Sequence, residues 1–150
     1  MLIGVISDTH GLLRPEAVRA LQGSELILHA GDVGDPRILD ELRAIAPIVA
    51  VRGNIDQGDW AMKLPEYELV ERQGVSIYLL HDLNQLDLDP PAAGVQAVIS
   101  GHSHKPAMRT EKGVLYLNPG SAGPRRFKLP VTVARLSVVS KKLAAELLEL

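Results

Sequence analysis

The stretch MLIGVISDTH, residues 1–10, sets the plan of this 150-residue chain, because an uninterrupted apolar run ends abruptly in polar residues. Leu2–Ser7 has the length and continuity of a strand that is buried on both faces. Asp8 and His10 follow it, two positions apart, in a predicted sharp turn. The same arrangement, an apolar strand closed by a small polar cluster, recurs along the chain and organises the whole analysis.

Residues 1–51 predict alternating strands and helices. Pro15 opens a helix, Leu26–His29 is a second strand, and Pro36 opens another helix with apolar residues at helical spacing. Ile48–Val51 is the third strand. This order is typical of parallel strands joined by right-handed crossovers.

After Pro65 the pattern changes to strands joined by short turns, of which Gln73-Gly74 and Glu111-Lys112-Gly113 indicate hairpins. Asn84–Gly94 is acidic, contains two prolines and predicts at most a helical turn. Residues 1–150 show no linker or repeat, so we expect a single domain. The last strand could instead be a helix on propensity alone. The strands expected here are Tyr67–Arg72, Val75–Leu80, Val95–Ser100, Ala107–Thr110, Val114–Leu117, Val131–Val138 and Leu143–Leu148.

Composition excludes several classes of protein. With 46% apolar residues and a net charge of −2, the chain is ordinary and nearly neutral, which gives no sign of non-specific nucleic-acid or membrane-surface binding. It has no cysteine, so disulfides and thiolate metal sites are impossible. It lacks a secretory leader and any apolar run of about 18 residues, so we expect a cytoplasmic protein. Its few aromatic residues make a base-stacking platform hard to build, although a nucleotide substrate is not excluded.

Five polar clusters close the predicted strands. Because the carboxyl ends of strands in open α/β sheets form one rim, these clusters can converge on one site. Carboxylates, imidazoles and an amide carbonyl are ligands for a pair of divalent metals, with oxygen donors suiting Mn²⁺ and imidazoles adding affinity for Fe, Zn or Ni. Two metals that share a carboxylate usually activate water against phosphorus. The clusters are Asp8-Thr9-His10, Gly31-Asp32, Gly53-Asn54-Ile55-Asp56, His81 and Gly101-His102-Ser103-His104.

Each residue alone also has an ordinary structural explanation. An aspartate after a strand is usually a helix N-cap, and Asn54 after glycine is usually a turn residue. His102 and His104 could be exposed loop residues, and His29 is expected to pack against the edge of the core. Four of the five histidines nevertheless fall in these clusters at predicted strand ends. Independent structural roles would not produce that distribution, so the metal site is favoured.

At these clusters the sequence resembles the calcineurin-like metallophosphoesterase superfamily, specifically its small YfcE-like phosphodiesterase branch. The family pattern is D-x-H, G-D, G-N-x-D, a lone H and G-H-x-H, and it is matched in order. Asn118-Pro119-Gly120-Ser121 also matches, so the resemblance runs from Ser7 to about Arg126. It implies an α/β fold, a four-layer αββα sandwich of two mixed β-sheets flanked by helices, known as the metallo-dependent phosphatase fold.

The resemblance also implies two metal ions, Mn²⁺ being the first choice. Asp32 would bridge them, and Asp56 would orient a histidine or the Asn54 loop, unless it merely caps a turn. The first ion would be held by Asp8, His10, Asp32 and His104, and the second by Asp32, Asn54, His81 and His102.

Two departures from the family pattern bear on activity. Many members carry a histidine that donates a proton where this chain has Ile55. A missing general acid costs roughly 10²–10⁴ in rate, so activated aryl phosphodiesters should be favoured over alkyl monoesters. The branch usually continues its lone histidine as H-G-H, whereas His81 is followed by Asp82-Leu83, which adds negative charge near an anionic substrate.

Arg125 and Arg126 are the first candidates for a positive group that clamps phosphate, with a solvated basic turn as the alternative. Arg14 and Arg52 are weaker candidates of the same type.

We therefore hypothesise a phosphodiesterase in which a hydroxide shared by two metals, about 3.5–4 Å apart, attacks phosphorus directly. Asp32, Asn54, Asp56 and Arg125 are the residues assigned to catalysis. The alternatives are a phosphomonoesterase and a protein-interaction scaffold, such as the retromer-coat subunit that keeps this fold. The expected partner is a small phosphoester. A second copy of the chain could dock on Asp59–Met62, unless Trp60 only covers the core.

Overall fold

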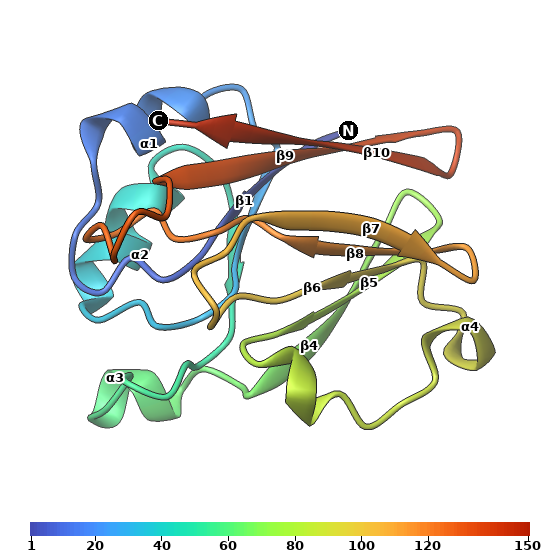
Figure 1. Ribbon diagram of the computed structural model, residues 1–150, viewed down its shortest axis with the longest axis horizontal. Coiled ribbons are helices and arrows are strands. Elements are labelled where there is room, and N and C mark those ends of the chain that lie inside the picture. The colour runs from blue at the N-terminus through green and yellow to red at the C-terminus, as the bar shows by residue number, and fades with distance from the viewer.

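The computed structural model describes residues 1–150 as two five-stranded β-sheets that pack face to face (Figure 1). The first sheet has the strand order β10-β9-β1-β2-β3. Strands β1, β2 and the edge strand β3 are parallel to one another. Strand β9 pairs antiparallel with both β1 and the other edge strand, β10. The bounds are β1 Leu2–Ile6, β2 Leu26–His29, β3 Ile48–Ala50, β9 Thr132–Val139 and β10 Lys142–Glu149.

The second sheet has the order β4-β5-β6-β8-β7. Strands β5, β6 and β8 are parallel, and the edge strands β4 and β7 pair antiparallel through the two predicted hairpins. Both sheets are therefore mixed. The bounds are β4 Tyr67–Arg72, β5 Val75–Leu80, β6 Ala97–Ile99, β7 Ala107–Glu111 and β8 Val114–Asn118.

Short helices cover the outer faces of the two sheets. Helices α1 and α2 lie against the first sheet, and the 3₁₀ turn η1 with α4 lies beside the second (Figure 1). No helix is long and apolar enough to cross a membrane. The bounds are α1 Pro15–Ala20, α2 Pro36–Arg43, α3 Asp59–Met62, η1 Leu83–Gln85 and α4 Pro90–Ala93.

The continuous apolar run of β1 serves two different cores. Ile3 and Val5 pack between the sheets, whereas Ile6 packs beneath the helices of the outer layer. Because successive side chains of a strand point to opposite faces, a strand with packing on both sides must be apolar throughout. Gly4 lies on the helix side, where a Cβ would come within 2.7 Å of Leu21 Cδ2. The expected αββα arrangement is confirmed. The helical layer on the second sheet consists only of the short elements η1 and α4.

One helix was not predicted. Asp59–Met62 forms α3, a single turn too short to show a helical apolar pattern in sequence. Trp60 is half-buried and packs against the helix-side core, whereas Met62 is 70% exposed. Trp60 thus covers the core, which was the alternative to a docking surface at Asp59–Met62. The opposite ambiguity, at Leu143–Leu148, is resolved as the strand β10.

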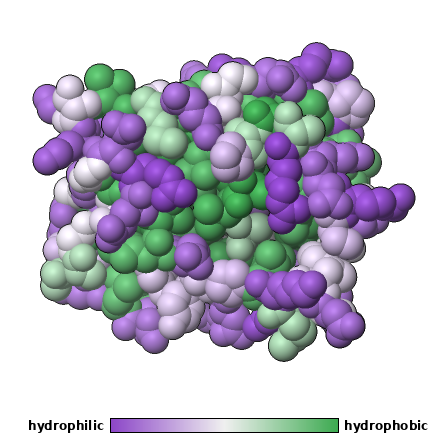
Figure 2. Space-filling view, turned by 180° about the vertical axis from the view of Figure 1, so that it is seen from behind, coloured by the Kyte–Doolittle hydropathy of each residue, from purple (hydrophilic) through white to green (hydrophobic).

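The face of the molecule opposite to the view of Figure 1 shows apolar residues gathered near its middle and polar residues around them (Figure 2). On the edge strand β4, Tyr67 and Leu69 are exposed. The loops after β1, β2, β3, β5 and β6 contact one another at one end of the sandwich, as the rim argument expects.

Candidate metal centre

Strained backbone marks the turns of this rim. Five of the ten non-glycine residues with positive φ belong to the predicted ligand set. Aspartate and histidine tolerate the left-handed region better than most residues, but each such residue still costs about 1–3 kcal/mol, and such strain clusters at functional sites. The five are Asp8 (55°), His10 (47°), Asp32 (55°), His102 (73°) and His104 (63°).

Glycines in the motifs make room for the carboxylates. A Cβ on Gly53 would lie 2.1 Å from both the backbone N and the Oδ1 of Asp32. A Cβ on Gly101 would lie 2.1 Å from Ser7 Oγ and 2.6 Å from Asp8 Oδ2. The glycines before Asn54 and His102 are therefore required by close approach of neighbouring rim loops.

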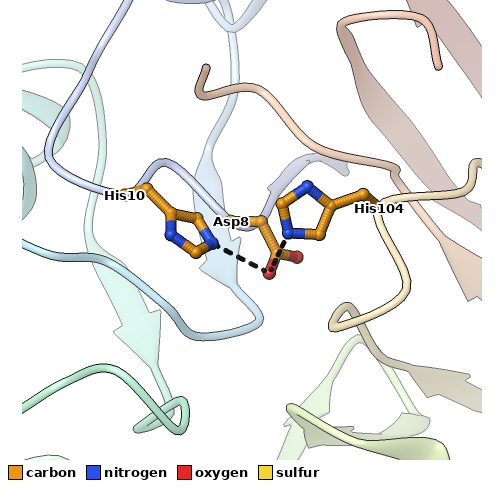
Figure 3. Close-up of side chains that lie close together, drawn as sticks. All are labelled: Asp8, His10 and His104. Carbon is orange, nitrogen blue, oxygen red and sulfur yellow. Dashed lines mark ion pairs between the residues drawn. The ribbon is translucent and has the colours of Figure 1, made fainter. Parts of the chain in front are cut away.

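Asp8 divides its two oxygens between different tasks. Its Oδ2 accepts hydrogen bonds from Ser7 Oγ at 2.7 Å and from the backbone N–H of His102 at 3.1 Å. Its Oδ1 is buried without a hydrogen-bond partner, 3.4 Å from His104 Nε2 and 3.7 Å from His10 Nε2 (Figure 3). One oxygen thus fixes the side chain, and the other is left to face two imidazoles.

Asp32 repeats this division. Its Oδ1 accepts a hydrogen bond from the backbone N–H of Ile55 at 3.0 Å. Its Oδ2 lies 3.4 Å from His10 Nε2 and 3.3 Å from His81 Nε2. A single oxygen between imidazoles of two different groups has the position that a bridging ligand needs.

The tautomer of His81 follows from its neighbours. Its Nδ1 lies 2.7 Å from the carbonyl oxygen of Ala30, which can only accept, so Nδ1 carries the proton when the ring is neutral. The unprotonated Nε2 then faces Asn54 Oδ1 at 3.0 Å and His102 Nδ1 at 3.3 Å. Lone pairs gathered at such distances repel unless a proton or a cation lies among them.

The seven predicted ligands therefore come together. Two groups of ligand atoms, each within 4.8 Å of one another, are formed by Asp8, His10 and His104 and by Asp8, Asp32 and His81. Asn54 and His102 adjoin the second group through His81. Oxygen and imidazole donors with buried, unpartnered atoms fit divalent cations.

The carboxylates are held in their charged form. Burial opposes ionisation of Asp8 and Asp32, but hydrogen bonds and the nearby imidazoles outweigh it and lower the pKa of both. Burial opposes the charged form of His81, yet Asp32 raises the pKa of that imidazole. Burial, assisted by the charge of Arg126, lowers the pKa of His104. Charged acceptors and a largely neutral His104 suit cation binding.

Asp56 contacts the Asn54 loop and makes no hydrogen bond to a histidine. Its Oδ2 accepts from the backbone N–H groups of Gly53 at 2.8 Å and Val33 at 3.2 Å, and its Oδ1 accepts from Gly34 at 2.9 Å. The side chain therefore ties the loop after β3 to the loop after β2.

His29 has a more specific place than sequence reasoning gave it. It is fully buried, and its Nδ1 accepts from the backbone N–H of Gly31 at 3.1 Å. Thr9 Oγ1 donates to the carbonyl of Val33, so it accepts from His29 Nε2 at 3.0 Å. Burial lowers the pKa of His29 to about 4. A neutral His29 thus joins the Asp8 turn to the Asp32 turn, and only its position just before Ala30-Gly31-Asp32 hinted at this.

The candidate phosphate-binding residues take different positions. Arg125 is exposed, and its Nε donates to the carbonyl of Leu129. Arg52 pairs with Glu66 at 3.0 Å beside the predicted ligands. Asp82 Oδ2 lies 4.0 Å from His102 Nε2, as expected of a charge near the site. A cavity of about 310 Å³ opens here, lined by Arg52, Gly53, Asn54, Asp56, Glu66, His81, Asp82, Gln85 and His102.

Two mixed sheets with paired aspartates and histidines at their strand ends define the class of metal-dependent phosphoesterases. The chain belongs to the calcineurin-like phosphoesterase superfamily, since the model of that superfamily's domain matches residues 1–141. It is 40% identical, over 160 residues, to a probable metallophosphoesterase of Methanothermobacter thermautotrophicus, covering 99% of this chain and 92% of the relative.

Solved structures share the fold. An archaeal phosphodiesterase has a TM-score of 0.83 at 23% identity, covering 99% of this chain and 100% of its own. Vps29 of Chaetomium thermophilum has a TM-score of 0.81 at 20% identity, covering 99% and 97%. At these identities the likeness establishes the architecture alone.

Proposed function

We propose that this chain is a phosphodiesterase that works with two divalent ions at the rim of the sandwich. The observation that carries the proposal is the pair of inward carboxylate oxygens. Asp8 Oδ1 is buried and unpartnered between His10 and His104, and Asp32 Oδ2 lies between His10 and His81. A structural role for Asp8 would leave no reason for its buried Oδ1 to lack a donor.

Mn²⁺ is the proposed ion, because the set offers both carboxylate oxygens and imidazoles, with Fe, Zn and Ni as alternatives. Bound ions would lower the pKa of a water molecule and neutralise charge on the phosphoryl oxygens. The first ion would be held by Asp8, His10, Asp32 and His104, and the second by Asp32, Asn54, His81 and His102.

The chain's own residues hold this donor set in place. Ser7 Oγ and the backbone N–H of His102 fix Asp8, and the N–H of Ile55 fixes Asp32. The carbonyl of Ala30 directs His81. Removing such a supporting contact typically lowers metal affinity or activity by about 10–100-fold. Asp56 supports the Asn54 loop in the same way.

A phosphate-binding role for Arg125 stays part of the proposal. The segment that carries it begins at Gly123, where a Cβ would touch the carbonyl oxygens of Asp8 and Thr9 at 2.5 and 2.3 Å. Arg125 uses its Nε on Leu129, and its terminal nitrogens make no hydrogen bond in the structure. A guanidinium with free terminal nitrogens can bind a phosphate in a forked geometry.

Ile55 sets the expected substrate preference. Its backbone N–H donates a hydrogen bond to Asp32 Oδ1. Its side chain, 39% exposed, has no proton to give a leaving group. Esters whose leaving group departs without protonation should therefore react best, and phosphodiesters with an aryl leaving group meet that condition.

The direct test is hydrolysis by metal-stripped protein supplied with Mn²⁺. We expect release of p-nitrophenolate from bis-p-nitrophenyl phosphate to exceed release from p-nitrophenyl phosphate, and glycerol phosphate to be poorest. A preference for the monoesters would favour a phosphomonoesterase. No hydrolysis with Mn²⁺, Fe²⁺, Zn²⁺ or Ni²⁺ would leave the interaction scaffold as the better account.

A further inference from the structure

An aromatic ring stands exposed in a strongly basic loop, residues 123–130. Phe127 is 88% exposed, the most of any large apolar residue, and its φ of 55° holds a bulky side chain in the left-handed region. Burial of such a ring would be worth about 1.5–3 kcal/mol, so leaving it in water needs a reason. We call residues 125–128, Arg-Arg-Phe-Lys, the basic tip.

The basic tip is attached to the candidate metal centre. Ser121 Oγ donates to the backbone carbonyl of Asp8 at 3.0 Å, and Arg14 donates two hydrogen bonds to the carbonyl of Gly123. From the other side, Lys105, which directly follows His104, lines one hollow together with Phe127 and Lys128. The ring thus shares a hollow with Lys105, the residue after the proposed ligand His104, in a loop whose start contacts the Asp8 turn.

Positive charge around the ring is uncompensated. Lys105, Arg125, Arg126 and Lys128 form no ion pair, whereas six other arginines of the chain do. The chain as a whole carries a net charge of −2, so this is a local concentration of cations. It attracts an anion with more than one charge.

We propose that the basic tip binds the nucleoside part of a short single-stranded oligonucleotide whose phosphodiester lies at the metal centre. The inference deepens the proposed function and rests on it. A base would stack on Phe127, and the next phosphate would pair with Lys105, Arg126 and Lys128. An aromatic face flanked by cations is the arrangement by which proteins bind single strands, at about 1–3 kcal/mol per stacked base. The scarcity of aromatic residues weighed against such a platform in sequence, but one exposed ring is enough for one base.

Three chromogenic esters with the same leaving group separate the contributions. They are methyl p-nitrophenyl phosphate, the p-nitrophenyl ester of thymidine 5′-phosphate, and the 3′-phosphorylated form of the latter. In each, water forms a new P–O bond, the P–O bond to p-nitrophenolate breaks, and the proton of the water goes to solvent. We expect kcat/KM to rise at least tenfold when methyl is replaced by thymidine, and again with the 3′-phosphate.

Variants assign these gains to residues. Phe127→Ala should lower the thymidine-to-methyl ratio of kcat/KM at least fivefold, and Phe127→Trp should restore it. Lys128→Ala and Lys105→Ala should lower the gain from the 3′-phosphate and weaken its dependence on salt. Val139→Ala removes another exposed apolar side chain, 66% exposed at the end of β9, and serves as the matched control that leaves both ratios unchanged.

The outcomes distinguish the two proposals. If the wild-type protein hydrolyses none of the esters, the proposed function fails. If it hydrolyses all three with equal kcat/KM, the phosphodiesterase stands and the basic tip does not bind nucleosides. An exposed ring among cations can also enter an anionic membrane surface. Sedimentation with phosphatidylserine vesicles that Phe127→Ala abolishes, without a nucleoside gain, would overturn the inference in favour of that surface.

Discussion

At the scale of the residue, the candidate centre depends on how each aspartate divides its oxygens. The sequence predicted which residue types meet, because Asp8, Asp32 and His81 each follow a strand. It could not predict that Oδ2 of Asp8 is taken by Ser7 and a backbone N–H while Oδ1 is left free. That division depends on loop geometry with positive φ, which no local pattern of these residues specifies.

Replacing Asp32 with alanine should abolish both metal binding and hydrolysis. Supporting contacts cost about 10–100-fold when removed, so loss of the oxygen shared by two groups should cost more than 100-fold. Metal content and kcat/KM on bis-p-nitrophenyl phosphate measure the two effects. Asp40→Asn, on the exposed side of α2, is the control. Full activity in Asp32→Ala would refute the assignment.

His29 should make the metal-free protein sensitive to mild acid. Its folded pKa is about 4 and its ordinary value is 6.5, so between these the unfolded chain binds a proton that the folded chain does not. Stability is therefore lost as pH falls from 6.5 to 4, by up to about 3 kcal/mol. Urea unfolding at pH 7, 5.5 and 4 measures this. His29→Gln should show a shallower loss over this window, and equal slopes would contradict the argument.

At the scale of the element, strands were the easier part to predict. The bounds of β2, β4 and β5 agree with the prediction to the residue, and β4 and β5 are delimited by the hairpin turn Gln73-Gly74. Helix α3 was missed, since one turn after Gly58 carries no periodicity. The order of strands in the second sheet, with β8 between β6 and β7, also had no signal in the sequence.

The loop after β6 should tolerate no side chain at Gly101. A Cβ there would meet Ser7 Oγ and Asp8 Oδ2, so Gly101→Ala should displace Asp8 and cost about 1–3 kcal/mol. Titration with Mn²⁺ followed by chemical unfolding reports both losses. Gly113→Ala is the control, because its Cβ has open space and strains only a distant turn. It should lose stability while keeping metal affinity, and equal metal affinity in the two variants would count against this account.

At the scale of the whole molecule, five loops from two sheets meet at one end of the sandwich. The rim argument predicted this convergence, because parallel strands place their carboxyl ends together. What the sequence could not show was the tip of the loop at residues 123–130, where Arg125 turns back to Leu129 and Phe127 stands in solvent. Tips of loops are set by few contacts, so composition alone does not place them.

Mn²⁺ should stabilise the molecule as a whole. An ion that binds only the folded chain adds about 2.7 kcal/mol at one hundred times its Kd, which raises Tm by roughly 5–10 °C in a domain of this size. Calorimetry with and without Mn²⁺ measures the shift, and excess EDTA should reverse it. An unchanged Tm at saturating Mn²⁺ would show that the loops of this rim do not bind the cation.

The central claim is most directly tested by anomalous diffraction from crystals soaked in Mn²⁺. The account predicts two peaks that share Asp32, one coordinated by Asp8, His10 and His104 and the other by Asn54, His81 and His102. A single peak, peaks outside this rim, or none at saturating Mn²⁺ would contradict it.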